Sequence, residues 1–289
     1  WWSSRPSSPP VLPLGSSSPW WCSWRAPSSF MPAGAGFGLR LLQARLQRVR
    51  LLPMKLQAKP QLTKPPPQRR PMPADHHPLR SVLETVGPDS CPGQFNFHCH
   101  TLCSDGSLEP LALIRQASSR GLTQLAVTDH HSSASFQPMQ DWLKQQRDLG
   151  ETVPNLWSGM EISAILRGCL VHVLALGFEP AHRSLAVYNR GDAAVGEALR
   201  AESVCQAIHD AGGLAILAHP GRYRVGFADL IDAAAELGFD GGEAWYDYDM
   251  QTRWSWSPVV CEAIDRRLKN LGLLRTCGTD SHGFDLEGR

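Results

Sequence analysis

Apolar and polar positions follow two different rhythms along the chain from about residue 90 onward. Short apolar runs of strand length are separated by longer segments in which apolar residues recur every three or four positions. We expect strands over residues 94–98, 122–130, 156–163, 169–178, 214–220, 239–245 and 273–282. Between them we expect helices over residues 107–121, 136–148, 192–211, 227–238 and 257–271. This alternation is typical of an α/β fold in which helices cover a parallel sheet, either closed as a barrel or open.

Residues 1–80 lack this alternation and differ in composition. They are rich in Ser, Pro, Arg and Trp, and their one helical pattern, the basic amphipathic run Leu39–Leu52, is stopped by Pro53. We expect a disordered, low-complexity basic leader over residues 1–80 and one folded α/β domain over residues 90–289. The alternatives are an artefactual extension, a helix that binds a membrane surface, or an organelle transit peptide, which the absence of acidic residues resembles.

Charge is divided unevenly along the chain. Eleven Lys and Arg residues and no acidic residue precede residue 75, which leaves 17 basic against 27 acidic residues in the remainder. The remainder therefore carries a net charge of −10, although the whole chain carries +1. Stable binding to duplex nucleic acid would need a basic face, so we expect none.

The eight cysteines show neither a CxxC pair nor a regular spacing. We therefore expect reduced thiols, as in a cytosolic protein, and no disulfide framework. No apolar run approaches the roughly 20 residues that a membrane-spanning helix needs, so we expect a soluble protein without a membrane partner. We expect a cytoplasmic location, or an organellar one if residues 1–80 are a transit peptide. These features do not predict an oligomeric state.

Polar residues with useful chemistry recur at the carboxyl ends of the predicted strands. They are His98, His100, Asp129, His130, Glu161, His219, Asp280 and His282. In parallel α/β folds the carboxyl ends of the strands meet on one face, where binding sites are built. We therefore expect these residues to share one pocket.

His98 and His100 are the first pair in this series. Side chains two residues apart on a strand point to the same face, so both imidazoles can share one metal ion. Asp105 follows in a Ser-Asp-Gly turn, from which a short carboxylate can reach the same pocket. The alternative for the histidine pair alone is two surface imidazoles on an edge strand.

The later positions also have ordinary structural interpretations. A histidine such as His130 is often a hydrogen-bonded core group or a helix cap, and Asp129 is a candidate for orienting a liganding ring. Glu161 alone would be a charge at the rim of its strand, and Arg222 alone a solvated loop charge. His172 lies inside an apolar strand, where a lone imidazole is costly, so it is either hydrogen-bonded in the core or bound to a metal.

Taken together, six histidines and three carboxylates on one predicted face favour a metal cluster. Imidazole-rich sets with a few carboxylates suit Mn, Zn or Fe better than Ca or Mg. Nine ligands exceed what one ion uses, so we expect two or three divalent ions. Such ions hold a hydroxide at neutral pH and stabilise displacement at phosphorus, while Arg222 can grip a phosphate oxygen. We therefore predict phosphoester hydrolysis.

Six motifs resemble those of the PHP (polymerase and histidinol phosphatase) family and follow its order over residues 94–283. They are FNFHCHTLCSDG, LAVTDHH, SGMEIS, VHVLAL, LAHPGRYR and CGTDSHG. The resemblance implies a distorted, TIM-like (β/α)7 barrel with metal ions at the carboxyl ends of its strands. By matching position, it implies three ligand sets: His98, His100, Glu161 and Asp280; Glu161, His172 and His219; and Asp105, His130 and His282. Glu161 and Asp280 are the candidate catalytic residues, and Arg222 and His131 are the candidate substrate contacts.

Within the family, the wording of TDHH, GMEIS and AHPGRYR is most similar to phosphoesterases that act on nucleotides. That branch includes nucleoside 3′,5′-bisphosphate phosphatases and 5′-to-3′ exoribonucleases. The expected substrate is a small nucleotide or the 5′ end of a short oligoribonucleotide. The sequence departs from this branch in two ways. Only about forty residues separate the strands of His172 and His219, where the family carries a longer helical insert, and the chain stops seven residues after His282. A closing helix is therefore missing or the sequence is incomplete.

Three interpretations remain open at this stage. The loop WYDYDM (245–250) can stack a base on Trp245 or Tyr246, or it forms an aromatic lid packed on the rim. The same cluster would also serve histidinol phosphate or another sugar-like monoester. The third interpretation is a non-catalytic interaction module, as in some DNA polymerases, which predicts eroded ligands and an attached polymerase body.

Overall fold

The computed structural model describes residues 76–288, all of which fall within the unit Lys64–Arg289. The leader expected over residues 1–80 therefore lies almost wholly outside the described residues, and its expected helix lies entirely outside them.

The first described helix, α1 (Pro78–Leu83), already belongs to the packed part of the chain. The ring of His77 caps its N-terminus by accepting a hydrogen bond from the backbone N–H of Leu79. Leu79 and Leu83 are fully buried in the larger hydrophobic core. Folded structure therefore begins N-terminal to residue 90.

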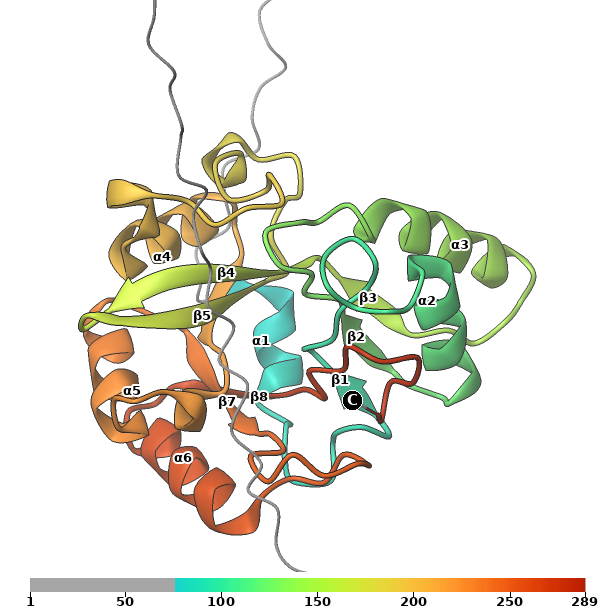
Figure 1. Ribbon diagram of the computed structural model, residues 1–289. Coiled ribbons are helices and arrows are strands. Elements are labelled where there is room, and N and C mark those ends of the chain that lie inside the picture. The colour runs from blue at the N-terminus through green and yellow to red at the C-terminus, as the bar shows by residue number, and fades with distance from the viewer. Residues whose placement is uncertain (1–75, 289) are drawn as a thin grey trace, which may run out of the picture. The chain divides into compact units, whose positions relative to one another are not determined.

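The remaining elements follow the expected order, and most strands are shorter than expected (Figure 1). The strand expected over residues 156–163 is divided into two, and the helix expected from residue 192 begins at Ala201. The strands are β1 (Phe95–Asn96), β2 (Gln124–Ala126), β3 (Asn155–Trp157), β4 (Gly159–Leu166), β5 (Cys169–Leu176), β6 (Leu214–Leu217), β7 (Gly241–Trp245) and β8 (Leu274–Cys277). The helices are α2 (Pro110–Ser119), α3 (Phe136–Asp148), α4 (Ala201–Asp210), α5 (Phe227–Glu236) and α6 (Pro258–Asn270). Short 3₁₀ turns are η2 (Arg183–Leu185), η3 (Gly196–Leu199) and η4 (Pro220–Arg222).

The strands form two ladders, and the mixed α/β class is confirmed. One sheet has the parallel order β1-β2-β3, and the other has the order β4-β5-β6-β7-β8. In the second sheet β6, β7 and β8 are parallel, whereas β5 is antiparallel to both β4 and β6. The expectation of a wholly parallel sheet is therefore wrong for β5.

A tight hairpin explains the reversed strand. Arg167 and Gly168 alone separate β4 from β5, and both have positive φ, 49° and 70°. A two-residue turn of this kind joins antiparallel strands and matches their natural twist. The Arg-Gly dipeptide between two apolar runs was the signal in the sequence.

The reversal also places His172 correctly for the site. His172 pairs with Ser163 across the hairpin, and Ser163 lies two residues after Glu161 on β4. Residues opposite each other in an antiparallel pair, and residues two apart on one strand, share a face. His172 therefore shares the face of Glu161 although it lies in the first half of its own strand.

Backbone contacts beyond the ladders join the two sheets. Isolated parallel bridges pair Cys99 with Ser281 and His130 with Glu161. Close to the first bridge, the backbone N–H of Asp280 donates to the carbonyl of His98 over 2.8 Å. Both junctions are made by residues at or beside the expected site, so the inter-sheet contacts fix the backbone that carries it.

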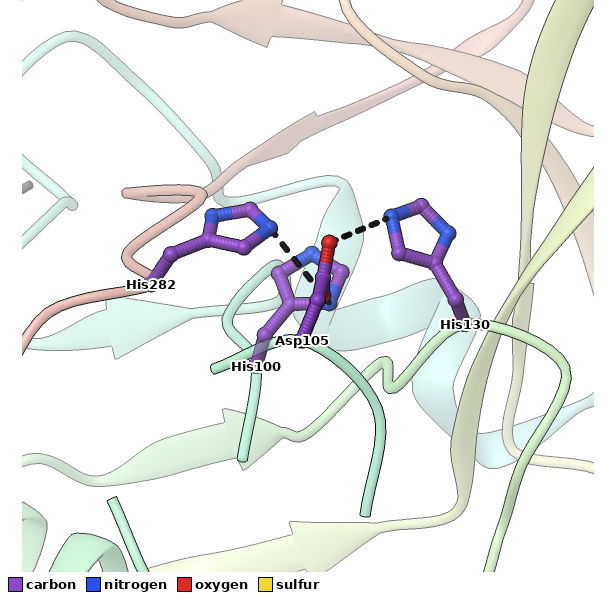
Figure 2. Close-up of side chains that lie close together, drawn as sticks. All are labelled: His100, Asp105, His130 and His282. Atoms are coloured by element: carbon purple, nitrogen blue, oxygen red, sulfur yellow. Dashed lines mark ion pairs between the residues drawn. The ribbon is translucent and has the colours of Figure 1, made fainter. Parts of the chain in front are cut away.

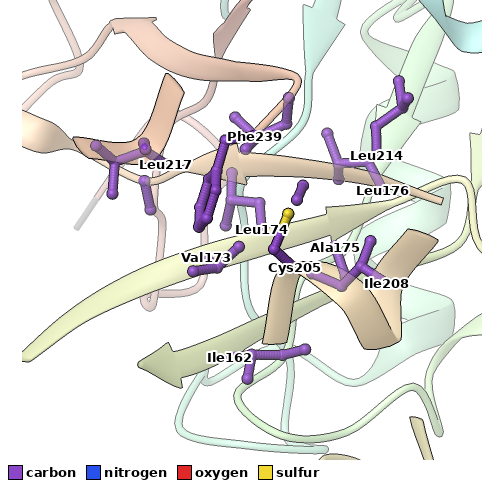
Figure 3. Close-up of a cluster of buried hydrophobic side chains, with 14 of the residues drawn as sticks. Ile162, Val173, Leu174, Ala175, Leu176, Cys205, Ile208, Leu214, Leu217 and Phe239 are labelled. Atoms are coloured by element: carbon purple, nitrogen blue, oxygen red, sulfur yellow. The ribbon is translucent and has the colours of Figure 1, made fainter. Parts of the chain in front are cut away.

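Helix α4 covers the hairpin and β6 through the larger of two hydrophobic cores (Figure 3). Val173, Leu174 and Leu217 from the sheet and Ile208 from α4 are all buried there. A smaller core lies between α2, α3 and the parallel sheet. The apolar face of the second sheet thus packs on helices and leaves the polar rim for the site.

Within residues 76–288, no helix is long and apolar enough to cross a membrane. The seven cysteines of the same part of the chain are all free thiols, as expected.

Candidate metal centre

Glu161, in β4, lies at the centre of the site and is 1% exposed. Five imidazoles have a nitrogen 2.8–3.6 Å from its carboxylate oxygens: those of His98, His100, His130, His172 and His219. The first three face Oε2 and the last two face Oε1. These histidines come from four separate places in the chain, on or just after β1, β2, β5 and β6. The convergence expected of these residues is therefore present.

Asp280 is the second buried carboxylate of the centre. Its Oδ1 lies 3.2 Å from Nε2 of His98 and 3.1 Å from Nε2 of His100. Its Oδ2 accepts hydrogen bonds from the hydroxyl of Tyr246, over 2.7 Å, and from Nη1 of Arg222, over 3.1 Å. Asp280 thus joins the two histidines of the first motif to the opposite wall of the site.

Asp105 lies close to His100, His130 and His282, and these four residues form an outer group of candidate ligands (Figure 2). Its oxygens lie 3.3 Å from Nε2 of His282, 3.7 Å from Nε2 of His130 and 3.6 Å from Nδ1 of His100. The side chain of Asp105 is 56% exposed, in contrast to the buried Glu161 and Asp280. The outer group is therefore the accessible edge of the centre.

Two ligand candidates have strained backbones. His219 has a φ of 26° and Asp280 a φ of 51°, in a region that residues other than glycine rarely adopt. The neighbour of His130, His131, also has a positive φ of 51°. Such strain concentrates at functional sites because the surrounding packing holds it.

The pKa values of the buried groups are set by the close approach of imidazoles to carboxylates. Burial alone would lower the pKa of His98, but the carboxylates of Glu161, Glu243 and Asp280 outweigh it and raise that pKa well above its usual value. The same balance of burial against Asp280 and Glu161 raises the pKa of His100 to about 9. Burial would raise the pKa of Glu161, but the charges of His98 and His172 hold it well below its usual range. The centre therefore keeps its inner carboxylates ionised.

His130 behaves in the opposite way. Burial, reinforced by the charges of His100 and His172, lowers the pKa of His130 to about 4. Its ring is therefore neutral at pH 7, which is the form that ligates a metal.

The donor set fits divalent cations better than protons. Three groups have ligand atoms within 4.8 Å of one another: His98, His100, Glu161 and Asp280; His100, Asp105, His130 and His282; and His130, Glu161 and His172. Neighbouring rings around Glu161 have centroids 4.8–5.6 Å apart, so fully protonated rings would repel one another. A divalent ion instead takes a lone pair from each nitrogen and oxygen.

These groups resemble the expected ligand sets, with two differences. The first group has the same four residues. The outer group adds His100 to the expected Asp105, His130 and His282, and the third contains His130 in place of His219. His219 still has Nε2 3.2 Å from Glu161, so it borders the same oxygen as His172.

Asp129 does not orient a histidine ring, which corrects its expected role. Its carboxylate accepts hydrogen bonds from the backbone N–H and the hydroxyl of Thr101 and from the hydroxyl of Ser104. Asp129 thus holds the loop that carries Asp105, because short side chains in that loop donate to it.

Sequence reasoning missed the group that does orient a ring, Glu243 in β7. Both of its oxygens lie 3.1 Å from Nδ1 of His98, and Glu243 is fully buried. A buried acid in the run GGEAW was the available signal, since a buried charge needs a partner.

The candidate substrate contacts differ in accessibility. The side chain of Arg222 is 42% exposed, next to Asp280. His131 is only 5% exposed and has Nε2 3.1 Å from the hydroxyl of Ser163, so its ring has little surface to offer a substrate. Trp245 and Tyr246 are also buried, and neither can stack an entering base as one interpretation required.

Two solved structures share the fold of this chain. A metal-free, sulfate-bound protein described as an amidohydrolase from Chromobacterium violaceum superposes with a TM-score of 0.54 at 21% identity, over 66% of this chain and 88% of its own. A protein from Bifidobacterium adolescentis, described as a metal-dependent phosphoesterase, gives 0.53 at 23% identity, over 68% of this chain and 90% of its own. The described domain therefore shares its fold with these two proteins.

The names of the curated relatives describe more specific activities. The 5′-3′ exoribonuclease of Haemophilus influenzae is 29% identical over 36% of this chain and 36% of its own length. The 5′-3′ exoribonuclease Rnm of Escherichia coli is 31% identical over 30% of this chain and 29% of its own. Phosphoribosyl 1,2-cyclic phosphate 1,2-diphosphodiesterase of Eggerthella lenta is 36% identical over 32% and 33%. The matched segment thus spans about a third of each relative.

No family model matches the chain. The relatives and the fold together confirm the resemblance to PHP phosphoesterases that the motifs indicate.

Proposed function

We propose that the protein is a metal-dependent phosphoesterase that hydrolyses a small nucleotide, such as a nucleoside 3′,5′-bisphosphate, or the 5′ end of a short oligoribonucleotide. The observation that carries this proposal is the convergence of five imidazoles on the buried carboxylate of Glu161. Burying so many imidazoles and carboxylates costs free energy unless they are paired or coordinate a metal ion. A shared set of divalent ions would provide that coordination.

Two or three divalent ions of Mn, Zn or Fe would be held by the nine candidate ligands. We assign them by the implied sets: His98, His100, Glu161 and Asp280; Glu161, His172 and His219; and Asp105, His130 and His282. When bound, such ions polarise a phosphoryl group and lower the pKa of water at the site. Glu161 and Asp280 are the groups we propose as catalytic, because both stay ionised and border several ligands.

Arg222 is the group we propose for binding the phosphate. Its Nη1 donates to Tyr246 and Asp280, which fixes the guanidinium beside the centre, while 42% of the side chain remains exposed. An arginine held in place in this way can form paired hydrogen bonds to a phosphate. It would orient the ester without moving a proton.

The substrate class rests on the relatives and on charge. Both exoribonuclease relatives act at 5′ ends by name. The chain after residue 74 carries a net charge of −10. This charge argues against stable binding to a nucleic-acid duplex. The name of the Eggerthella relative supports a second candidate, a cyclic phosphodiester of a sugar.

We also infer that the strands form a distorted (β/α)7 barrel. Support comes from the two bridges, Cys99 with Ser281 and His130 with Glu161, which link segments after β1 and β2 of one sheet to β8 and β4 of the other. Strands β3 and β4 would count as one bent strand, because a single residue, Ser158, separates them.

Phosphate release tests the proposed function. Adenosine 3′,5′-bisphosphate, 5′-phosphorylated short RNA, a cyclic sugar phosphodiester and histidinol phosphate would be compared with Mn²⁺ present and then chelated. We expect turnover of the nucleotide substrates that chelation abolishes. Turnover of histidinol phosphate alone would show that the substrate is a sugar-like monoester instead of a nucleotide. No turnover of any ester would refute the proposal.

A further inference from the structure

Strand β7 supplies none of the nine proposed ligands, yet one of its side chains and that of the residue following it contact three of them. Glu243 lies within β7 and Tyr246 follows its last residue, Trp245. Side chains three apart on a regular strand would point to opposite faces. A bulge resolves this, because Glu243 pairs with Thr276 while Trp245 pairs with the very next residue, Cys277. The extra residue turns Tyr246 to the same side as Glu243.

Glu243 contacts two ligand candidates from different strands. Its oxygens lie 3.1 Å from Nδ1 of His98, whose other nitrogen, Nε2, faces Glu161. Its Oε2 also accepts a hydrogen bond from the backbone N–H of His219 over 2.8 Å, at the residue whose φ is 26°. One buried carboxylate therefore fixes the ring of His98 and holds the strained backbone of His219.

Tyr246 does the same for an acid. Its hydroxyl donates to Oδ2 of Asp280 over 2.7 Å, so the other oxygen, Oδ1, faces His98 and His100. The ring is fully buried, which prevents the hydroxyl from exchanging its partner for bulk water. Asp280 itself has a positive φ, so this contact and the one from Arg222 help to hold a strained residue in place.

We propose that Glu243 and Tyr246 are positioning residues that set the metal affinity of the centre, and that the bulge in β7 is the feature that brings both to it. Glu243 fixes His98 and His219, and Tyr246 fixes Asp280. Neither residue touches the substrate. This inference rests on the metal site of the proposed function but not on which ester is cleaved. Partners that orient metal ligands typically contribute a factor of about 10 to 100 in affinity.

The test is a calorimetric titration of chelator-stripped protein with Mn²⁺, combined with thermal unfolding in chelator. Tyr246→Phe keeps the ring and removes only the hydroxyl. Its control is Tyr188→Phe, because Tyr188 is also buried and donates over 2.8 Å, but to the carbonyl of Ala198. We expect Tyr246→Phe to weaken Mn²⁺ binding about tenfold, while the control retains wild-type affinity.

Glu243→Gln provides a second, independent variant. Its control is Asp240→Asn, which alters a buried carboxylate that pairs with His209 instead of a ligand. We expect Glu243→Gln to weaken Mn²⁺ binding by about 10- to 100-fold, and Asp240→Asn to lower thermal stability without that loss.

The outcomes separate this inference from the proposed function. Mn²⁺ affinity in both Tyr246→Phe and Glu243→Gln within about twofold of wild type, or losses no larger than those of the controls, would overturn the inference. Absence of Mn²⁺ binding by the wild type would overturn it as well. Normal Mn²⁺ binding by the wild type without cleavage of any ester would refute the proposed function and leave the inference standing.

Discussion

Glu161 shows how much of the centre depends on one side chain. It borders five imidazoles from four places in the chain and is almost fully buried. Its role was predictable because it is the one carboxylate of the strand expected over residues 156–163, although it lies third in β4 and not at a strand end. The acid in GGEAW signals a buried partner, but the direction of Glu243 and Tyr246 was not predictable, because it depends on a bulge that the sequence pattern does not reveal. Asp129 was assigned to the wrong partner because loop hydrogen bonds compete with rings for a carboxylate.

Substitution Glu161→Gln tests the central carboxylate. Gln has the same shape but no charge, so the surrounding imidazoles lose their common partner. We expect Mn²⁺ content and phosphate release to fall at least about 100-fold. Elemental analysis and a phosphate assay measure this, with the exposed Glu151→Gln as the control. Unchanged metal content in Glu161→Gln would contradict the bridging role.

Substitution Arg222→Ala tests the phosphate contact. We expect KM for the ester to rise about tenfold or more, because a charged hydrogen bond to phosphate is lost. Arg224→Ala is the control, since Arg224 donates to the backbone carbonyl of Gly168. An unchanged KM in Arg222→Ala, measured by steady-state kinetics at saturating Mn²⁺, would remove Arg222 from the binding site.

At the scale of elements, the hydrophobic pattern predicted the order of strands and helices, and it placed α3 at residues 136–148 as observed. It overestimated strand length near the site, where β8 ends at Cys277 instead of continuing to residue 282. Residues 278–282 read GTDSH and carry no apolar side chain, and the backbone leaves the ladder there as Asp280 adopts a φ of 51°. The direction of β5 was mispredicted because an alternation of strands and helices does not predict a hairpin between two successive strands.

The junction between β1 and β8 is the element contact most sensitive to added volume. A Cβ at Gly278 would lie 2.2 Å from Cβ of His98 and 2.7 Å from its backbone nitrogen. We expect Gly278→Ala to destabilise the protein by about 2–4 kcal/mol and to weaken Mn²⁺ binding, because the backbone of a ligand must move. Gly87→Ala is the control, since no atom lies within 4 Å of its added Cβ. Equal stability of the two variants in urea unfolding would contradict the close approach.

Helix α4 is fastened to the start of β7 by a pair outside the centre. Nε2 of His209 lies 2.8 Å from Oδ2 of Asp240, and this contact, with a further one from Cys205, raises the pKa of His209 to about 10. The folded state therefore binds this proton more tightly than the unfolded chain, whose histidine pKa is about 6.5. The resulting stability is fully present below about pH 6.5 and is lost as the pH rises toward 10.

Replacing His209 should remove that pH-dependent stability. We expect His209→Asn to cost about 1–3 kcal/mol at pH 6 and much less at pH 10. Urea unfolding of the variant and the wild type in chelator at both pH values measures the difference. A cost that is equal at the two pH values would contradict the charged pair.

At the scale of the whole molecule, two sequence patterns predicted the fold class and the location of the site. The alternation of strands and helices predicted the α/β class, and polar residues at strand ends predicted that distant motifs meet. All nine candidate ligands do lie around one centre, from Asp105 at its open edge to Glu161 at its buried middle. The substrate was less predictable, because Trp245 and Tyr246, the aromatic residues considered for stacking a base, are buried.

Anomalous diffraction from crystals grown with Mn²⁺ tests the central claim most directly. We predict at least two peaks within coordination distance of Glu161, with a further ion beside Asp105 when the outer group is filled. Tyr246 and Glu243 should keep their contacts to Asp280 and His98 in that structure. Crystals that turn over substrate yet show no ion beside Glu161 would contradict the account.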